Sequence, residues 1–167
     1  VLTSNGSSSA PTWQDASAGL FDNYALFTHE DASNGGTSSD TTWNTRPINT
    51  TEVSQTWASL SSNQVTLSAG TYLIEWSSSV YKASYNQTRL RNVTDSTTIG
   101  LGLVTRSRSG DSDMSTSGGS AKLVITGSKA ISVEHFTESG QTNNGLGIDI
   151  DSGENNVFGI LKIFKHA

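Results

Sequence analysis

Residues 71–76 read Thr-Tyr-Leu-Ile-Glu-Trp, and this stretch decides the fold class because its apolar side chains recur with a period of two. Tyr72, Ile74 and Trp76 fall on one face of an extended chain, and Leu73 is the only large apolar residue on the other face. The stretch therefore predicts a β-strand with one strongly apolar side.

Comparable short runs recur between clusters of glycine, asparagine and serine. The predicted strands are Tyr24–His29, Thr41–Ile48, Gln64–Ser68, Gln87–Val93, Thr98–Thr105, Ala121–Thr126, Ala130–Thr137 and Val157–Lys165. Separators such as Ser68-Ala69-Gly70 supply residues that tolerate turns or a positive φ. Residues 51–61 come nearest to a helical period, but their serine, threonine and valine content argues against a helix. Short strands separated by turns predict an all-β fold, either a two-sheet sandwich or a jelly roll.

The composition excludes several classes of protein. Ser, Thr, Asn and Gly occupy 28, 21, 12 and 16 of the 167 positions, while hydrophobic residues make up 33% and charged residues 15%. No run of about 18 apolar residues occurs, so we expect no membrane insertion. The net charge of −5 with scattered cations lacks the basic face that nucleic-acid binding requires. The absence of cysteine excludes disulfides and thiolate zinc sites.

Residues 1–19 differ from the rest of the chain in composition. Val1, Leu2 and Trp13 are the only large apolar residues in 1–19, too few to offset the entropy of ordering that stretch as a core of its own. We therefore expect an extended N-terminal leader over residues 1–19 and one jelly-roll head domain over residues 20–167. A chain that opens on Val1 rather than methionine favours a fragment of a longer protein.

Four stretches of the domain carry a family resemblance. They are Trp43-Asn44-Thr45-Arg46-Pro47-Ile48-Asn49, Leu67–Glu75, Thr88–Asp95 and Leu161–Lys165. In this order they resemble the C-terminal domain of bacteriophage tail fibres, and the leader, with Val-Leu-Thr-Ser-Asn-Gly at 1–6 and Pro-Thr-Trp-Gln at 11–14, is similar to the segment that precedes such domains in phage and prophage tail proteins. The resemblance implies an antiparallel two-sheet jelly-roll sandwich of the C1q/TNF-like kind. This head domain would assemble as a homotrimer at the distal end of a virion fibre.

The function that this resemblance implies is host attachment. The partners would be two further copies of the chain, the upstream fibre shaft, and a bacterial cell-surface receptor, either a glycan or an outer-membrane protein. The expected location is the tail fibre tip of the virion, outside the cell, with no catalysis and no cofactor. Two alternatives stay open, namely a structural domain that terminates and trimerises the fibre, and a carbohydrate-active enzyme.

Motifs for catalysis are absent from the sequence. No Gly-x-Ser-x-Gly elbow occurs, and the spacing of His29, His135 and His166 identifies no acidic or hydroxyl partner. His135 alternates in register with Ile131 and Val133, which predicts a partly buried strand histidine rather than a general base.

Paired acids are the remaining candidates for chemistry. Asp111 with Asp113, and Asp149 with Asp151, are separated by two positions, a spacing that cannot by itself define the carboxylate pair of a glycosidase. Asp149, Asp151 and Glu154 are weak candidates for Ca²⁺, but the third ligand before glycine that an EF-hand requires is missing. We therefore expect no metal and interpret these acids as solvated loop residues.

Two further groups of side chains have more than one interpretation. Arg89 and Arg91 leave the same face of their strand, which is compatible with surface solvation or with ion pairing across a subunit interface. Trp43, Trp57 and Trp76 are expected in the core or in an interface rather than as sugar platforms.

Strand parity places the candidate binding loops. Successive antiparallel strands reverse direction, so the connections 81–86, 106–120 and 138–156 should all lie opposite the C-terminus, and the short turns 94–97 and 127–129 at the other end. Binding residues are disproportionately found on loops carried by a rigid scaffold. The candidate receptor-binding residues are Tyr81, Tyr85, Arg106, Arg108, Asp111, Asp113, Asn143 and Asn144. In a trimer, display of three copies of a weak site would raise the avidity by about 10²–10⁴. The alternative interpretation is that these loops are solvated connections that bind nothing.

Overall fold

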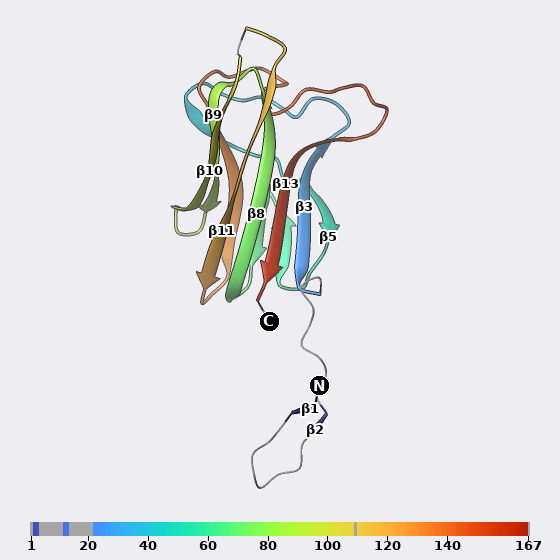
Figure 1. Cartoon of the computed structure of the whole chain (residues 1–167), viewed down its shortest axis with the longest axis vertical. Coiled ribbons are helices and arrows are strands. Elements are labelled where there is room, and N and C mark those ends of the chain that lie inside the picture. The colour runs from blue at the N-terminus through green and yellow to red at the C-terminus, as the bar shows by residue number, and fades with distance from the viewer. Residues whose placement is uncertain (1, 4–11, 14–21, 109, 167) are drawn as a thin grey trace.

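The computed structural model describes residues 2–3, 12–13, 22–108 and 110–166, and within them the chain is all-β (Figure 1). The strands of the domain are β3 (Tyr24–Asp31), β4 (Thr42–Thr45), β5 (Thr50–Val53), β6 (Ala58–Ser61), β7 (Gln64–Leu67), β8 (Gly70–Tyr81), β9 (Ser84–Asn92), β10 (Thr97–Ser107), β11 (Met114–Ile125), β12 (Lys129–Thr137) and β13 (Asn156–Lys165). None of the described residues forms a helix that could cross a membrane.

Two antiparallel sheets form the domain. The front sheet has the order β11-β8-β13-β3-β5, and Figure 1 shows β8, β13 and β3 of this sheet side by side facing the viewer. The back sheet has the order β10-β9-β12-β7-β6, with β4 pairing on β12. The structure thus confirms the predicted antiparallel two-sheet jelly roll.

The core lies between the sheets and follows the predicted alternation. Tyr72, Ile74 and Trp76 of β8 point inward and are buried, while Leu73 on the opposite face is 47% exposed. The buried apolar cluster comprises Ala25, Phe27, Ile48, Trp57, Val65, Leu67, Tyr72, Ile74, Trp76, Leu90, Leu123, Ile125, Ile131, Val133, Leu161 and Ile163. Trp57 and Trp76 therefore lie in the core as predicted.

Several predicted boundaries were wrong. β8 continues to Tyr81 and β9 begins at Ser84, so the predicted loop 81–86 reduces to residues 82–83. β11 begins at Met114, so the predicted loop 106–120 reduces to residues 108–113. The serines and glycines of β11 show no apolar alternation, yet they pair residue by residue with the serine run of β8.

The glycines of β11 explain why this strand is built from small residues. A Cβ on Gly118 would lie within 3.1 Å of the Ser77 Cα, and one on Gly119 would lie 2.7 Å from the Trp76 ring. Close approach of the two strands therefore excludes larger side chains at these positions. Residues 51–61, correctly not assigned to a helix, include most of β5 and all of β6. The sequence did not reveal these short strands because their side chains are mostly polar.

The predicted leader falls largely outside the described residues. Within it, β1 (Leu2–Thr3) pairs antiparallel with β2 (Thr12–Trp13). The predicted start of the domain at residue 20 also lies outside the described residues, which resume at Asp22.

Both described ends of the domain meet at one end of the sandwich. The Lys165 amide donates to the Asn23 carbonyl at 2.9 Å, and the His166 amide donates to the Thr71 carbonyl at 2.8 Å. We call this end the base (Figure 1). The opposite end carries the long connections and is called the loop end.

Candidate functional site

The loop end is formed by four connections that hydrogen-bond to one another, residues 32–41, 82–83, 108–113 and 138–155. The backbone bonds are Gly35 N to Gly147 O, Tyr81 N to Gly145 O, Ser139 N to Ala83 O and Lys82 N to Asp113 O, all between 2.9 and 3.1 Å. The loops that strand parity assigned to one end do lie together there, opposite the C-terminus (Figure 1). The fourth loop, 32–41, was not predicted as part of this surface.

Glycines allow the longest loop to pack closely against its neighbours. Gly147 has a φ of +139° and would place a Cβ against the Phe158 ring. A Cβ on Gly35 would lie 2.6 Å from the Leu146 carbonyl oxygen. The loop 138–155 therefore rests directly on the chain at 32–41 rather than projecting freely into solvent.

A fully buried arginine holds this loop to both sheets. Arg46 Nη2 donates to the carbonyls of Leu146 and Phe158, each at 2.8 Å, and Nη1 donates to the Ser79 carbonyl at 2.9 Å. Its backbone amide donates to the Val133 carbonyl of β12 at 2.8 Å. The resemblance included Arg46 without assigning it a role, and nothing in the surrounding sequence shows that an arginine at this position is buried.

Burial sets the protonation of the groups around Arg46. Burial lowers the Arg46 pKa to about 9, and burial together with the Arg46 charge lowers the pKa of His29 to about 3. His135, also buried, has its pKa lowered well below the usual value by the same two causes. His135 Nε2 lies 3.0 Å from Asn86 Oδ1, which can only accept, so Nε2 carries the proton. His135 is thus a neutral, fully buried strand histidine, more buried than predicted.

Two of the predicted receptor-binding residues lie beside each other at the top of the back sheet. Tyr85 of β9 and Arg106 of β10 are paired in register, and the guanidinium lies 5.3 Å from the centroid of the tyrosine ring. The Tyr85 side chain is among the exposed large apolar groups, at 54%. Glu138 borders the pair, because its carboxylate accepts bonds from the Ser84 hydroxyl and the Tyr85 amide.

The other predicted binding residues are separate from this pair. Tyr81 is nearly buried, and its hydroxyl lies 3.3 Å from Ser112 Oγ, so it supports the neighbouring loop. Arg108 pairs with Asp111 at 3.4 Å, and its amide donates to Asp113 Oδ2 at 3.1 Å. Arg108 and Asp111 thus form an exposed ion pair, and the Asp113 carboxylate is bonded to the backbone of the same loop.

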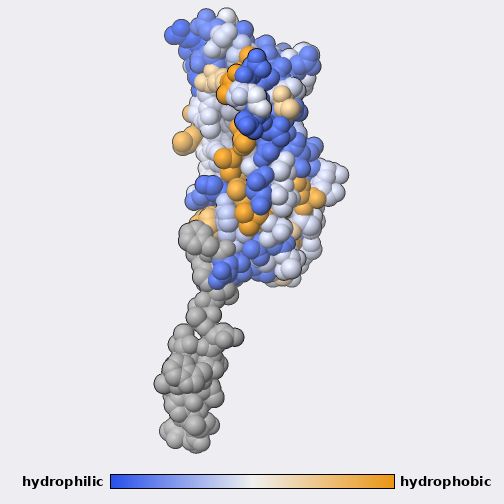
Figure 2. All heavy atoms as spheres, turned by 90° about the vertical axis from the view of Figure 1, so that its right-hand side faces the viewer, coloured by the Kyte–Doolittle hydropathy of each residue, from blue (hydrophilic) through white to orange (hydrophobic). Residues whose placement is uncertain are grey.

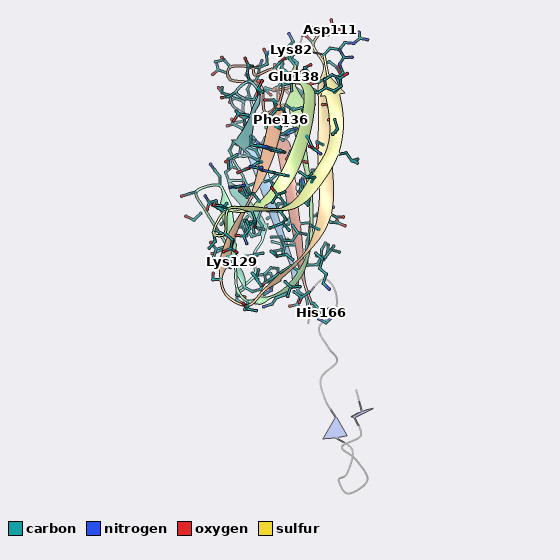
Figure 3. The ribbon with its side chains drawn as sticks, turned by 90° about the vertical axis from the view of Figure 1, so that its left-hand side faces the viewer. Lys82, Asp111, Lys129, Phe136, Glu138 and His166 are labelled. Atoms are coloured by element: carbon teal, nitrogen blue, oxygen red, sulfur yellow. The ribbon has the colours of Figure 1, made fainter. Side chains whose placement is uncertain are left out.

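The two predicted asparagines shape the backbone of the longest loop. Asn143 has a φ of +68°, and its amide donates to Thr37 Oγ1 at 2.9 Å. The Asn144 carbonyl accepts a bond from the Gly147 amide at 3.0 Å. Figure 3 shows Lys82, Asp111 and Glu138 at the loop end, whereas Lys129 and His166 lie far from it.

The weak metal candidates have local structural roles. Asp149 Oδ1 accepts bonds from the Asp151 amide at 2.9 Å and from Asn156 Nδ2 at 2.8 Å, and these bonds lower the pKa of Asp149. The Glu154 amide donates to Ser152 Oγ. Among the described residues, no three acids or histidines are grouped as metal ligands would be.

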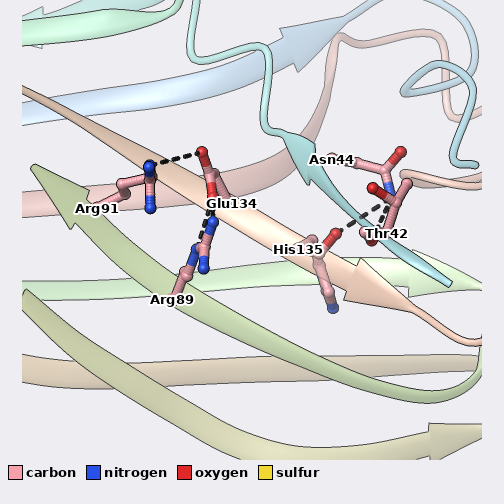
Figure 4. Close-up of polar contacts among 6 residues, drawn as sticks. All are labelled: Thr42, Asn44, Arg89, Arg91, Glu134 and His135. Atoms are coloured by element: carbon pink, nitrogen blue, oxygen red, sulfur yellow. Dashed lines mark hydrogen bonds and ion pairs between the residues drawn. The ribbon is translucent and has the colours of Figure 1, made fainter. Parts of the chain in front are cut away.

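The arginines of β9 form an ion-pair cluster within one chain (Figure 4). Arg89 Nη2 lies 2.5 Å from Glu134 Oε2, and Arg91 Nε lies 3.7 Å from Glu134 Oε1. The Arg89 guanidinium also stacks 4.2 Å from the centroid of Trp43, which contacts Phe136 edge-on. Both arginines do share one face, and their partner is a carboxylate on the neighbouring strand of the same chain.

A groove of about 480 Å³ lies on the front sheet beside its β11 edge. Leu101 and Leu103 of β10 line it together with Trp76 and Ile160. Leu101 is 59% exposed and Leu103 is 72% exposed. Figure 2 shows a further band of apolar side chains on the opposite side of the domain, where β3 and β5 lie.

The fold belongs to the class of jelly rolls found in TNF and C1q domains. Murine APRIL matches with a TM-score of 0.57 and 8% identity over 86% of this chain and 98% of that chain. Eiger TNF from S. frugiperda matches with a TM-score of 0.55 and 13% identity over 86% and 92% of the two chains. The globular domain of zebrafish complement 1qA matches with a TM-score of 0.54 and 12% identity over 86% and 98%.

These likenesses establish the fold alone, because the identities are low. No protein-family model matches the sequence, and no curated protein is similar to it.

Proposed function

We propose that this domain is the trimeric head of a bacteriophage tail fibre and attaches the fibre to the bacterial surface through its loop end. The observation that carries the proposal is that the two ends of the domain differ in structure. Asn23 and Lys165 meet at the base, while four mutually bonded loops occupy the opposite end. A shaft that joins at the base would leave the loop end facing the host, in keeping with the tail-fibre resemblance of the sequence.

The surface of the domain supports assembly of three copies. Leu101 and Leu103 are large apolar side chains exposed on an edge of the sandwich, next to a groove. Leu73 and Val157 are also exposed on the outer face of the front sheet. In a closed ring the edge of each copy covers the face of the next, which removes both apolar surfaces from water. The trimer buries an edge that would otherwise invite aggregation.

Two adjacent residues on β10 provide a matched test of assembly. Leu103 lines the groove, whereas Val104, which is 66% exposed, pairs with Gln87 on the outer face of the back sheet. Leu103→Asp should convert the trimer to monomer in sedimentation equilibrium, because it buries a charge in each interface. Val104→Asp should leave the trimer mass unchanged. A wild-type protein that sediments at the 17.7 kDa of one chain would refute the trimer.

Attachment is tested by competition. The purified trimer should reduce adsorption of the parent phage to its host, and replacing residues 108–113 with a Gly/Ser linker should abolish that competition while the trimer persists. A trimer that never competes, or infectivity that survives the loop replacement, would instead support a purely structural fibre end. Release of reducing sugar from host polysaccharide would favour the carbohydrate-active enzyme. The proposed setting is the extracellular virion, with the fibre shaft and the host receptor as partners.

A further inference from the structure

We propose that Tyr85 and Arg106 form a subsite for an acidic sugar, in which the tyrosine ring stacks on the pyranose and the guanidinium binds the sugar carboxylate. The inference rests on the proposed attachment to a surface glycan and names the chemistry of that glycan. It is carried by the position of the two side chains and by the absence, among the described residues, of a hydrogen-bond or ion-pair partner for Arg106.

The strands fix where both side chains point. Arg106 and Tyr85 are opposite each other at the loop end of the β9–β10 pair. Their neighbours Thr105 and Asn86 point into the sandwich, where Thr105 Oγ1 donates to Asn86 Oδ1 at 2.7 Å. Because side chains alternate along a strand, Tyr85 and Arg106 must leave the outer face of the back sheet. The proposed assembly packs the β10–β11 edge of one copy on the front sheet of the next, so the outer face of the back sheet remains open.

Arg106 differs from every other arginine in the described part of the chain. Arg46 donates to three carbonyls, Arg89 and Arg91 pair with Glu134, and Arg108 pairs with Asp111. For Arg106 the structure gives neither a hydrogen bond nor an ion pair within the described residues, only the ring of Tyr85. The N–H donors of the Arg106 guanidinium are therefore available to bind a ligand.

The nearby carboxylate of Glu138 forms no ion pair with this guanidinium within the described residues. The Ser84 hydroxyl and the Tyr85 amide lower the pKa of Glu138, and the Arg106 charge contributes to the same shift. Glu138 Oε2 is taken by the Ser84 hydroxyl and by the Tyr85 amide at 3.3 Å. The carboxylate thus anchors the start of β9 beside the tyrosine, and in the described part of the chain Arg106 forms neither a hydrogen bond nor an ion pair with it.

The two exposed groups match the two chemical faces of an acidic sugar. The open part of an aromatic ring packs against the apolar C–H face of a pyranose. A guanidinium fork binds a carboxylate through two parallel hydrogen bonds, more strongly than it binds a neutral hydroxyl. A neutral sugar would use only the ring, so the pair should discriminate in favour of a uronic acid.

The test is an NMR titration of the isotope-labelled domain with two trisaccharides of equal length, one of galacturonic acid and one of galactose. The acidic trisaccharide should shift the Arg106 Nε–H signal and bind at least about tenfold more tightly, since one charge-assisted contact is worth about one decade in Kd. Arg106→Gln should remove this preference, and Tyr85→Ala should remove binding of both sugars. Arg91→Gln, which alters a partly exposed arginine of β9 that is already paired with Glu134, should leave the preference intact.

The variants also separate this inference from the proposed attachment. Arg106→Gln removes no hydrogen bond or ion pair within the described residues, so an unchanged melting temperature and trimer mass should accompany the lost preference. An Arg106→Gln protein that still prefers the acidic sugar, or a wild type without preference, would overturn the subsite even if the domain competes with phage adsorption. A wild type that prefers the acidic sugar and an Arg106→Gln protein that does not would establish the subsite even if the domain fails to compete.

Discussion

Arg46 Nη2 lies 3.1 Å from His29 Nδ1, with both side chains buried between the sheets. A guanidinium nitrogen can only donate, so His29 Nδ1 accepts and the ring is neutral. The positive charge of Arg46 is met by backbone carbonyls of β8, β13 and the loop 138–155 instead of by a carboxylate. The buried Arg46 side chain therefore both stabilises the sandwich and holds the longest loop in place at the loop end.

Arg46→Lys should destabilise the domain by about 3 kcal/mol. An ammonium group cannot reach carbonyls on three separate segments, and each buried acceptor left without a donor costs about 1–3 kcal/mol. Urea unfolding of the two proteins measures the difference. Arg91→Lys, which alters a single partly exposed ion pair at 3.7 Å, should cost less than about 1 kcal/mol. Equal losses of unfolding free energy in the two variants would show that the Arg46 contacts stabilise the fold no more than a partly exposed ion pair does.

Acid should destabilise the domain well before its carboxylates are protonated. His29 has a pKa of about 3 in the fold, His135 is also held well below its usual pKa, and both return to about 6.5 on unfolding. The unfolded chain therefore binds more protons below pH 6.5, so stability is full above that pH and is lost as pH falls towards 3. Each histidine contributes a slope of about 1.4 kcal/mol per pH unit in this window.

Unfolding free energies measured between pH 7 and pH 4.5 give this slope directly. His29→Gln should reduce it by about one proton, whatever its effect on absolute stability. A flat profile over the window for the wild type would contradict the buried neutral histidines.

The sequence predicted those features that follow from alternation and parity. The apolar positions of β8 identified the core face, and counting strands correctly placed three loops at one end. Burial of Arg46 could not be predicted, because its partners are carbonyls at Ser79, Leu146 and Phe158, far apart in the chain. The first half of β11 was missed for a related reason, since Gly118 and Gly119 fit through contact with β8 and not through any local propensity.

Close approach at the β10–β11 edge makes Gly102 intolerant of a side chain. A Cβ there would lie 2.9 Å from the Gly118 carbonyl oxygen and against Thr88 Oγ1, which accepts a hydrogen bond from the Trp76 indole at 2.9 Å. Gly102→Ala should therefore destabilise the domain by about 1–3 kcal/mol, the usual cost of overpacking. Gly110→Ala is the matched control, because a Cβ on Gly110 meets nothing within 4 Å. Thermal unfolding that is indistinguishable for the two variants would show that this edge can separate freely.

Removal of divalent cations should leave the melting temperature of the domain unchanged. The Asp149 carboxylate, the best placed of the candidate ligands, already accepts bonds from the Asp151 amide and from Asn156 Nδ2. These bonds shape the loop without an ion, and the acids are not grouped as the six to eight oxygen ligands of Ca²⁺ would be. Melting curves recorded with excess EDTA and with added CaCl₂ should superimpose. A fall of several degrees with EDTA that CaCl₂ reverses would identify a cation bound by this loop and would change the interpretation of Asp149.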